Sequence, residues 1–582
     1  MLTAHDLLTR VPSLDAAARH ARLRDTFHIW PGSLAGAMDA SRAGAERAAD
    51  GLWRLDASTW SADPTVQKEI ANRLGWLRSP LAMADSIDRL RTFAASIRSD
   101  GFTDVVLLGM GGSSLAPEVL RAIVGTAPGW PRFHMLDSTD PAAIRAATTP
   151  PDRTLYILAS KSGTTIEPNS LAAHFRTHLE AARVPRWADH FVAITDEGTP
   201  LAERARSERF RDVFINPTDI GGRYSALSFF GLVPAALMGQ DVAALLGWGV
   251  AMLAPPEPDA ASRSAIDLGL LMGAGGANGR DKLTLLVPPS LEPFGLWVEQ
   301  LVAESTGKAG VGVVPIAGET AAEPTQYGND RAFVRLHFPP QADDSLLEAL
   351  KAGKKPIADI QLPEPLALGA EFVRWEIATA IAGTLLRINP FDEPNVQQAK
   401  DATKVLLDQF KNTGAFPQRA PDRTLPGGVT LTLSSAAGRA LKDRGPEAFL
   451  SLLADGDYLG LLAYVGPDEA LANALRSFRL AVRDRSRCAT MFGYGPRYLH
   501  STGQLHKGGP TSGVFVLITA TPTADLPIPG AAFSFATLEM AQALGDFASL
   551  DATGRRAVHV HLPSADPQLI RDVADAFLEG SA

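Results

Sequence analysis

Short β-rich runs alternate with helical stretches between residues 80 and 410, and this alternation constrains the fold more than any other feature. The runs of the first half include DVVLLGM, TLYILAS and HFVAIT, and those of the second half include KLTLLVP and RAFVRLHF. Apolar strands separated by helices are typical of parallel sheets that are covered on both faces. We therefore expect an α/β protein with two doubly wound parallel sheets.

Four regions are expected along the chain. Residues 1–80 predict a helical N-terminal segment, in which Asp63-Pro64 marks a helix start. The linker-like stretch LAPPEPDAAS separates a first α/β domain, residues 81–255, from a second, residues 256–410. A connection rich in proline and glycine then leads into an additional C-terminal α/β region, residues 411–582.

Composition limits the classes of partner. The chain has 582 residues, of which 46% are hydrophobic and 20% charged, and this balance is typical of globular proteins. Its net charge of -9 argues against nucleic acid and anionic membranes as partners. The N-terminus lacks a signal-peptide core, and the most apolar stretch, residues 224–239, is too short to span a bilayer. The single cysteine, Cys488, fits a reducing compartment, so we expect a cytoplasmic protein.

A glycine loop follows the first β-rich run. DVVLLGM continues into Gly111-Gly112-Ser113-Ser114 and then into the helical segment LAPEVLRAI. Backbone N–H groups and the dipole at a helix start suit a phosphate, so Gly112, Ser113 and Ser114 are candidate ligands. A tight turn without any ligand would have the same residues. A dinucleotide site is a rival interpretation, since Asp137 ends the next strand, but the third glycine of that fingerprint is Ser or Leu here.

A second loop has an excess of hydroxyl groups. Ser160-Lys161-Ser162-Gly163-Thr164-Thr165 lies between the strand TLYILAS and a helix. Helix capping requires only one or two such residues. Neutral donors together with one cation can surround a phosphate. We therefore predict a phosphate site with Ser160, Lys161, Ser162 and Thr165 as ligands.

These two loops, and three segments that follow them, resemble the sugar isomerase (SIS) domains of the glucose-6-phosphate isomerase family. Gly221-Gly222-Arg223-Tyr224-Ser225 is similar to the family's GGR[FY]S signature, and QLVAESTGK at residues 300–308 to its QxxxESxGK segment. Phe391-Asp392 followed by Lys400 is similar to its FDxxxxxxxK segment. Together, these matches cover residues 85–405. The resemblance implies an aldose–ketose isomerase of glycolysis and gluconeogenesis that uses no cofactor and no metal.

Glu304 is the candidate base for that reaction. Isomerisation requires one base that takes a proton from C2 and returns it at C1, and a carboxylate of raised pKa can do this. Glu304 is expected in the last turn of a helix, where the dipole tends to raise its pKa. Gln300, one turn earlier on the same face, would orient Glu304 or the substrate and is a candidate binding residue. A solvated glutamate at a helix end is the ordinary alternative.

Two cations are candidate partners of this base. Arg223 follows Gly222, which brings the backbone close, and would stabilise the negative charge of the enediolate intermediate. A purely structural ion pair is the alternative for Arg223. The resemblance assigns ring opening to a lysine and a histidine, and Lys400 matches the lysine. An exposed helix lysine is the alternative, and position alone does not separate Lys400 from Lys404.

The histidine departs from the family pattern. The usual GQH segment is absent after Glu304, where the sequence reads YGNDRAF. The C-terminal region instead contains YLHSTGQLHKGGP, and its Gly503-Gln504-Leu505-His506 resembles the absent segment with one insertion. We expect residues 411–582 to complete the active site through His506, with His500 as the alternative. A loop histidine without a catalytic duty would also fit.

The layout is most similar to the isomerase part of fused transaldolase/glucose-6-phosphate isomerase proteins. About eighty residues precede the first domain, too few for a (β/α)₈ barrel, so we expect no transaldolase activity from this chain and a separate transaldolase as a candidate partner. The family precedent also makes a homodimer a candidate assembly. Glucose 6-phosphate and mannose 6-phosphate both stay open as substrates.

Three other function classes compete with this one. A non-catalytic sugar-phosphate sensor would need only the two loops. Another SIS isomerase acting on amino sugars would need an ammonia-handling element, and the sequence has no N-terminal cysteine nucleophile for one. A metal-dependent isomerase would need clustered histidines and carboxylates, whereas the histidines here are scattered.

Overall fold

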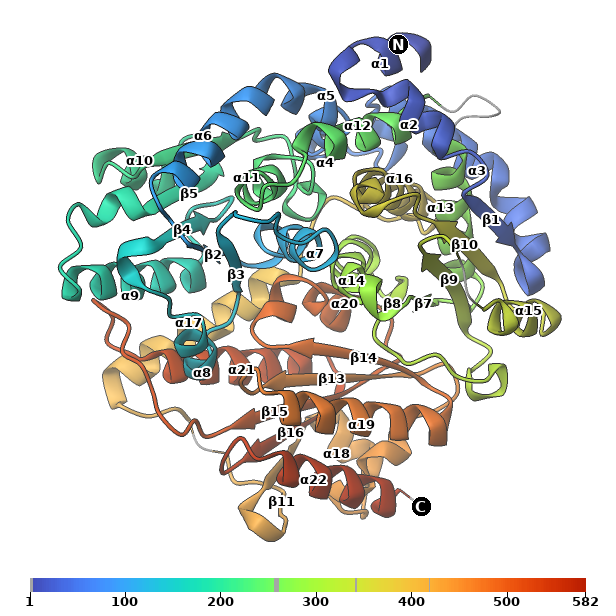
Figure 1. Cartoon of the computed structure of the whole chain (residues 1–582). Coiled ribbons are helices and arrows are strands. Elements are labelled where there is room, and N and C mark those ends of the chain that lie inside the picture. Colours follow the sequence, from blue (N-terminus) through green and yellow to red (C-terminus); the bar gives the residue numbers. More distant parts are fainter. Residues whose placement is uncertain (1–3, 256–260, 341–342, 418, 582) are drawn as a thin grey trace.

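Three β-sheets organise the part of the chain that the computed structural model describes, namely residues 4–255, 261–340, 343–417 and 419–581 (Figure 1). The first sheet has the strand order β3-β2-β4-β5-β6, and all of its strands are parallel. Its strands are β2 (Asp104–Leu108), β3 (Arg132–Leu136), β4 (Thr154–Ala159), β5 (Phe191–Asp196) and β6 (Asp212–Asn216). The helices around it are α6 (Ile87–Ser99), α7 (Leu115–Ile123), α8 (Pro141–Ala146), α9 (Ile166–Ala181), α10 (Pro200–Ser207) and α11 (Phe229–Leu237).

The second sheet repeats this topology. Its order is β1-β10-β9-β7-β8. Among its parallel strands, the first in the chain, β7, lies between the second, β8, and the third, β9. In the first sheet, β2 lies between β3 and β4 in the same way. Its strands are β7 (Lys282–Leu286), β8 (Val314–Ile316), β9 (Arg331–His337), β10 (Ile357–Gln361) and β1 (Phe27–Trp30). Its helices are α12 (Val242–Met252), α13 (Ser262–Ala277), α14 (Glu292–Thr306), α15 (Ser345–Ala352), α16 (Leu368–Leu385) and α17 (Val396–Thr413).

The N-terminal segment is not purely helical. It forms α1 (Ala4–Thr9), α2 (Ala16–Arg22), α3 (Ala35–Trp53), α4 (Pro64–Ala71) and α5 (Ser79–Ala82), but also the strand β1. Strand β1 pairs antiparallel with β10 and closes one edge of the second sheet. The sequence FHIW of this strand is too short and too irregular to predict a strand from its own pattern, so only the partner strand reveals it.

The C-terminal region forms a third, mixed sheet of order β11-β12-β16-β15-β13-β14. Its strands are β11 (Arg423–Thr424), β12 (Thr430–Leu433), β13 (Tyr458–Tyr464), β14 (Ala489–Tyr494), β15 (Gly513–Ala520) and β16 (Arg556–Leu562). Its helices are α18 (Ser435–Leu441), α19 (Glu469–Ser486), α20 (Gly503–Gly508), α21 (Phe535–Ala552) and α22 (Pro567–Gly580). The predicted α/β class is therefore confirmed, while the predicted domain boundaries stay predictions.

Helix α14 lies where the three regions meet. Figure 1 shows it at the centre of the molecule, beside α7 of the first region and α20 of the third. From Val298 to Thr306 every residue of α14 is buried, so the helix has no face left for solvent. A helix that is buried all round is a core helix, which can hold its side chains in fixed positions. Among the described helices, none is long and apolar enough to cross a membrane.

The third region also packs against the first. Helix α17, which follows the second sheet in the chain, lies against α21 of the third. Leu407 of α17 and Leu538 of α21 belong to the same buried cluster as Phe175 of α9. We call the hydroxyl-rich loop of residues 160–165 the phosphate-type loop. Helix α9, which follows this loop in the first region, is thus covered by α17 and by the third region.

Candidate active site

Glu304 lies in the last turn of α14, as the sequence predicts, and is buried. Nε2 of Gln300 donates to Oε2 of Glu304 at 3.2 Å and to the carbonyl oxygen of His500 at 2.8 Å. Burial raises the pKa of Glu304 to about 7, although the positive charge of Arg223 opposes this shift. The physical cause is therefore burial, and not only the helix dipole on which the sequence argument relied. A carboxylate of such pKa suits general base chemistry near neutral pH.

Arg223 places a fixed cation beside this carboxylate. Its Nη1 lies 3.5 Å from Oε1 of Glu304 and donates to Oε2 of Glu393 at 2.9 Å. Its Nε donates to Oγ of Ser305 at 2.7 Å. Its Nη2 donates to the carbonyl oxygens of residues 390 and 392, each at 2.9 Å. Arg223 thus also anchors the loop before α17. It lies beside the Glu304 carboxylate and forms a structural ion pair at the same time, so the two alternatives considered for Arg223 do not exclude each other.

A second buried cation, Lys308, anchors the same loop. Its Nζ donates to the carbonyl oxygen of Asn389 at 2.8 Å and to Oδ1 of Asp392 at 2.6 Å. Burial, together with the charge of Arg223, lowers the pKa of Lys308 to about 8. In the sequence, Lys308 is recognised only as part of a motif. In the structure, it connects that motif to the segment around Asp392.

The small glycines of residues 111 and 112 allow their loop to contact the backbone of Gly222 and of His500. Gly111 has a positive φ of 54°, and a Cβ atom there would lie 2.5 Å from the carbonyl oxygen of His500. A Cβ atom on Gly112 would lie 2.1 Å from the carbonyl oxygen of Gly222. Real Cβ atoms do not approach backbone atoms so closely, so both positions require glycine. A Cβ atom on Gly222 itself would point into open space.

The two serines of this loop differ in their surroundings. Ser114 is fully buried, and its Oγ donates to the carbonyl oxygen of Gly111 at 3.1 Å, so this hydroxyl closes the turn. Ser113 has an exposed fraction of 9% and no hydrogen bond from its hydroxyl among the described residues. Of the two predicted ligands, Ser113 is therefore the one whose hydroxyl is available to a phosphate.

The loop of residues 160–165 gathers hydroxyl groups at the start of α9. Oγ of Ser160 lies 3.0 Å from Oγ1 of Thr165 and accepts from the N–H of Gly163 at 3.1 Å. Oγ of Ser162 lies 3.0 Å from Oγ1 of Thr164. Thr165 is the N-cap of α9, but its side chain makes no capping bond. The N–H group of Ile166, the first of the helix, is therefore open to an anion.

Lys161 is placed differently from what the sequence predicts. Its Nζ forms an ion pair with Asp196 and donates to the carbonyl oxygen of Thr218 at 3.2 Å. Asp196 is buried and would be left as an uncompensated charge without this partner. The ammonium group of Lys161 is thus committed to the protein, and the backbone and hydroxyl groups of the loop are the ones that face an anion.

His500, and not His506, lies beside these elements. It ends the short 3₁₀ segment Arg497–His500, and its Nε2 is 2.8 Å from Oε1 of Glu167 in the first turn of α9. Gln542 of α21 donates to the same Glu167 oxygen at 2.6 Å. Burial would raise the pKa of Glu167, but the charges of His500 and Lys400 hold it below its ordinary value.

One cavity of about 430 Å³ connects the phosphate-type loop with the candidate ring-opening residues. It is lined on one side by Thr165 and Glu167, and on the other by Lys400 and His500. Lys400 projects from α17, and Lys404, the rival lysine, lines the same cavity one turn further on. The charge of Lys400 is among the causes that lower the pKa of Glu167. The structure therefore brings Lys400 and His500 together, whereas position in the sequence did not separate the two lysines.

The prediction for His506 needs correction. Its ring is buried in α20, with its centroid 5.8 Å from that of Tyr498 and 5.0 Å from that of Phe515. Neither ring nitrogen has a hydrogen-bond partner among the described residues. Burial, followed by the charge of Lys507, lowers the pKa of His506 well below its ordinary value. A ring enclosed in this way is out of reach of a substrate.

Helical geometry explains this error. In α20, Gln504 faces the end of α14. Its Nε2 donates to the carbonyl oxygen of Gly307 at 2.9 Å and to Oδ1 of Asn395 at 2.8 Å. Two residues on in a helix is a rotation of about 200°. His506 therefore points away from Gln504 and into the core. Within GQLH, Gln504 is the residue that connects α20 to the end of α14 and the start of α17.

Sequence reasoning missed three residues of this site. Glu167 contacts His500, Gln542 donates to Glu167, and Glu393 pairs with Arg223. Glu167 stands two residues after Thr165 in the first helical turn, so its place next to the phosphate-type loop was a usable signal. Nothing in the sequence around Gln542 indicates that α21 lies against α9.

The dinucleotide interpretation is not supported. Both carboxylate oxygens of Asp137 accept from Arg497, at 2.7 Å from Nε and 2.8 Å from Nη2. The carboxylate that would bind a ribose is therefore occupied by a residue of the third region, in a bidentate pair that leaves little capacity for a ligand.

Comparison with known proteins finds similarity to phosphoglucose isomerases. The family model described as phosphoglucose isomerase matches residues 81–313. A glucose-6-phosphate isomerase of Parasynechococcus marenigrum (strain WH8102) is 29% identical over 466 residues, which cover 69% of this chain and 82% of the relative. That of Thermosynechococcus vestitus is 28% identical, over 68% of this chain and 87% of the relative.

Two solved structures share the architecture. A hypothetical protein from Thermus thermophilus has a TM-score of 0.55 at 25% identity, over 65% of this chain and 99% of that chain. A glucose-6-phosphate isomerase from Chlamydia trachomatis has a TM-score of 0.52 at 18% identity, over 70% and 93%. The second likeness bears on the fold alone. The family match, the curated relatives and the shared motifs thus make this chain similar to glucose-6-phosphate isomerases.

Proposed function

We propose that this protein interconverts glucose 6-phosphate and fructose 6-phosphate. The observation that carries the proposal is the buried Glu304, whose pKa is raised to about 7 and whose carboxylate lies 3.5 Å from the guanidinium of Arg223. A base and a fixed cation at this separation match the two needs of an enediolate mechanism, proton abstraction and charge stabilisation. A protein that only bound sugar phosphate would not need them together.

Substrate binding rests on the two loops of the first sheet. In this proposal the phosphate binds at the start of α9, where the hydroxyls of Ser160, Ser162 and Thr165 and the N–H group of Ile166 are neutral donors for it. Ser113 adds a hydroxyl from the neighbouring loop. No cation is required at this position, because the helix dipole favours the dianion.

Ring opening is assigned to His500 and Lys400. The pyranose form must lose a proton from the C1 hydroxyl and gain one at the ring oxygen before the aldehyde appears. His500 is held by Glu167 at 2.8 Å, and Lys400 lines the same cavity. A carboxylate on one ring nitrogen fixes the tautomer and makes the other nitrogen a better proton acceptor. Ring opening thus depends on a residue of the third region.

Isomerisation is assigned to Glu304. Its carboxylate takes the proton from C2, the electrons of the C–H bond form the C1–C2 double bond, and the carbonyl electron pair moves onto O1. Arg223 stabilises the negative charge that develops there. After a proton has passed from O2 to O1, Glu304 returns its own proton to C1 and the ketone forms at C2. Gln300 holds the Glu304 carboxylate in position through its 3.2 Å hydrogen bond.

A coupled assay of fructose 6-phosphate conversion tests this function. The wild type should turn over in the presence of EDTA, and Glu304→Gln should lower kcat by about 10²- to 10⁴-fold, the usual contribution of a general base. Glu348→Gln, at an exposed position of α15, is the matched control and should keep wild-type activity. Calorimetry should show that Glu304→Gln still binds the substrate. A wild type that binds sugar phosphate without turnover would support a sensor instead.

The other expectations from the sequence belong to the same proposal. A place in glycolysis and gluconeogenesis follows from the reaction, and the single cysteine favours a reducing compartment such as the cytoplasm. A homodimer and a separate transaldolase partner stay predictions.

A further inference from the structure

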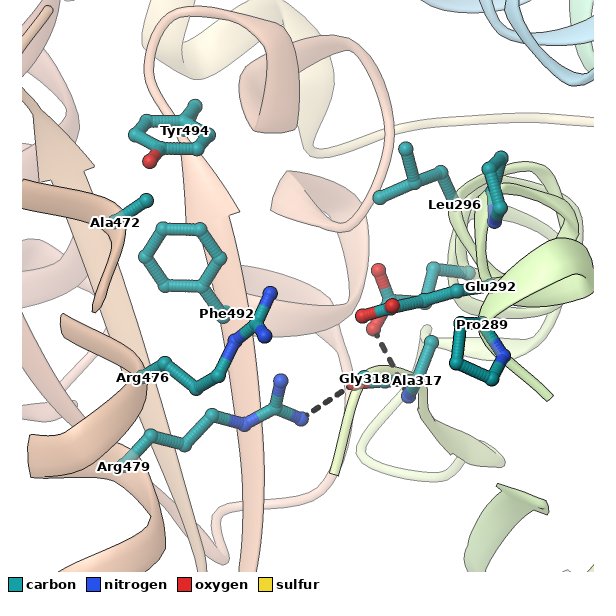
Figure 2. Close-up of a pocket in the computed structure, with 12 residues that line it drawn as sticks. Pro289, Glu292, Leu296, Ala317, Gly318, Ala472, Arg476, Arg479, Phe492 and Tyr494 are labelled. Atoms are coloured by element: carbon teal, nitrogen blue, oxygen red, sulfur yellow. Dashed lines mark hydrogen bonds between the residues drawn. The ribbon is translucent and has the colours of Figure 1, made fainter. Parts of the chain in front are cut away.

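A second cavity, of about 330 Å³, contacts a different face of the catalytic helix. Glu292, Leu296 and Glu299 of α14 line it and share one face at spacings of four and three residues, whereas Gln300 and Glu304 lie on the neighbouring face. Its other wall is formed by α19 and β14 of the third region, as Figure 2 shows. We call this space the α14–β14 cavity. It lies outside the site described above and has no role in the proposed reaction.

A crevice of the kind that binds ligands in α/β proteins adjoins this cavity. In open α/β sheets, ligands bind at the carboxyl ends of the strands where the chain order switches direction. In the first sheet this point lies between β2 and β4, whose following loops are the glycine loop and the phosphate-type loop. The equivalent strands of the second sheet are β7 and β9. Their following loops line an adjoining space of about 690 Å³, which shares Pro289, Glu292, Gly318 and Arg476 with the α14–β14 cavity.

Two unpaired charges face each other across the cavity. Arg476 of α19 and Glu292 of α14 point toward each other in Figure 2. Neither forms a hydrogen bond or an ion pair with any of the residues that the structure describes. Gly318 lies next to Glu292 and to a second arginine, Arg479: a Cβ atom on Gly318 would be 3.5 Å from Oε1 of Glu292 and 3.2 Å from Nη1 of Arg479. A ligand in the cavity could therefore pair with Arg476 and Glu292, and Gly318 exposes backbone there because it has no side chain.

The remaining lining combines buried polar groups with aromatic rings. Arg479 is buried, and its Nη2 donates to the carbonyl oxygen of Ala317 at 2.5 Å. Oε1 of Glu299 accepts from the N–H of Ala317 at 3.2 Å. Burial raises the pKa of Glu299 to about 8, so at neutral pH its carboxyl group is largely protonated and can donate a hydrogen bond. Phe492 and Tyr494 of β14 add two rings that pack edge to face at 4.8 Å.

We propose that the α14–β14 cavity binds a phosphorylated sugar or polyol as an effector, separately from the catalytic site. Arg476 pairs with the phosphate, the carboxyl groups of Glu292 and Glu299 bind hydroxyls, and the rings of Phe492 and Tyr494 face the C–H surface of the ligand. Charged hydrogen bonds give such a site its orientation and aromatic surface supplies contact area, as in small-molecule pockets of this size.

The cavity is positioned to influence both catalytic steps. Glu299 immediately precedes Gln300, which holds Glu304 and the carbonyl oxygen of His500. Tyr494 ends β14, and the chain then runs through residues 495 and 496 into the segment Arg497–His500. A ligand that contacts Glu299 and Tyr494 therefore contacts the two elements that place the proposed base and the proposed ring-opening histidine.

Calorimetry with sorbitol 6-phosphate tests the proposal, because this polyol has no carbonyl group and cannot be isomerised. The wild type should show two classes of site. Arg476→Ala combined with Glu292→Ala should weaken one class at least about tenfold, the loss expected for one charged hydrogen bond. Ser160→Ala combined with Thr165→Ala should weaken the other class, so that failure of the catalytic proposal and failure of this one are distinguishable. Arg444→Ala, at an exposed arginine of the same region, should keep both classes.

Inhibition kinetics provide a second readout. Sorbitol 6-phosphate should inhibit the wild type in a mixed pattern, because it acts at both sites, and should inhibit the Arg476→Ala/Glu292→Ala variant in a purely competitive pattern. Ala472→Phe, which fills the cavity without removing a charge, should give the same change. A single class of site in the wild type, or two classes that survive both the double variant and Ala472→Phe, would overturn the proposal.

Discussion

Nε2 of His500 lies 2.8 Å from Oε1 of Glu167, although 333 positions separate the two residues in the chain. His500 belongs to the third region, and Glu167 follows the phosphate-type loop of the first. The contact places an imidazole over the start of α9, on the wall of the cavity that Lys400 also lines. The C-terminal region therefore supplies a side chain to the candidate site within a single chain.

Replacing His500 should affect ring opening and not proton transfer. His500→Ala is expected to lower kcat for glucose 6-phosphate by about 10²-fold or more, since a general acid or base is lost. A four-carbon aldose phosphate cannot close a ring, because its terminal hydroxyl is phosphorylated, and its isomerisation should be nearly unchanged. Parallel assays of the two substrates measure this. An equal loss with both would mean that His500 serves the proton transfer itself.

The origin of His500 within the same chain can be tested by mixing variants. Equal amounts of His500→Ala and Glu304→Gln protein are expected to show no more activity than the two measured separately, because each chain lacks one residue of its own site. Co-expression, followed by a turnover assay, makes the test independent of subunit exchange. Recovery of activity toward one quarter or one half of the wild-type value would mean that the histidine reaches the site of a partner chain.

His506 should be dispensable for catalysis. His506→Phe replaces a buried ring whose two nitrogens have no described partner with an apolar ring of similar shape. Removing an unsatisfied buried polar group is neutral or stabilising, so the free energy of unfolding should be unchanged or higher. Urea unfolding and the coupled assay measure both quantities. A selective loss of activity on ring-closed substrate would return the ring-opening role to His506.

The pH dependence of kcat/KM should report Glu304. Burial raises the pKa of Glu304 to about 7, and its base function requires the unprotonated form, so kcat/KM should fall as pH decreases through about 7. The negative charge of Glu393 contributes to this raised pKa. Glu393→Gln is therefore expected to move the acid limb to lower pH, whereas Glu348→Gln should leave it in place. An acid limb that Glu393→Gln does not move, or moves to higher pH, contradicts this assignment.

Gly111 should be required for reasons beyond its backbone conformation. Gly111 and Gly101 both have positive φ, but a Cβ atom on Gly101 has no neighbour within 4 Å, whereas one on Gly111 would lie 2.5 Å from the carbonyl oxygen of His500. Gly101→Ala should cost about 1 kcal/mol of unfolding free energy and preserve kcat. Gly111→Ala should in addition displace His500 and lower kcat by about 10²-fold. Equal effects of the two substitutions would mean that only backbone strain is involved.

Local sequence determined much of this protein. Apolar runs alternating with helices specify parallel sheets, because a strand buried on both faces needs helices on each side. The glycine and hydroxyl loops, Glu304 and Arg223 follow from the same kind of argument, since each depends on residues close together in the chain. Glu304 lies at its predicted place in the last turn of α14 because helix boundaries are local features.

Tertiary packing decided the rest. Lys161 turns to Asp196, Asp137 is bound by Arg497, and His500 replaces His506 as the histidine at the site. Each of these outcomes depends on how a distant segment packs, and above all on how α20 and the segment before it settle against α14. Spacing along a chain fixes which side chains share a helical face, but it does not fix which face meets another region 200 or 300 residues away. That choice is made by which side chains are buried where the three regions pack together.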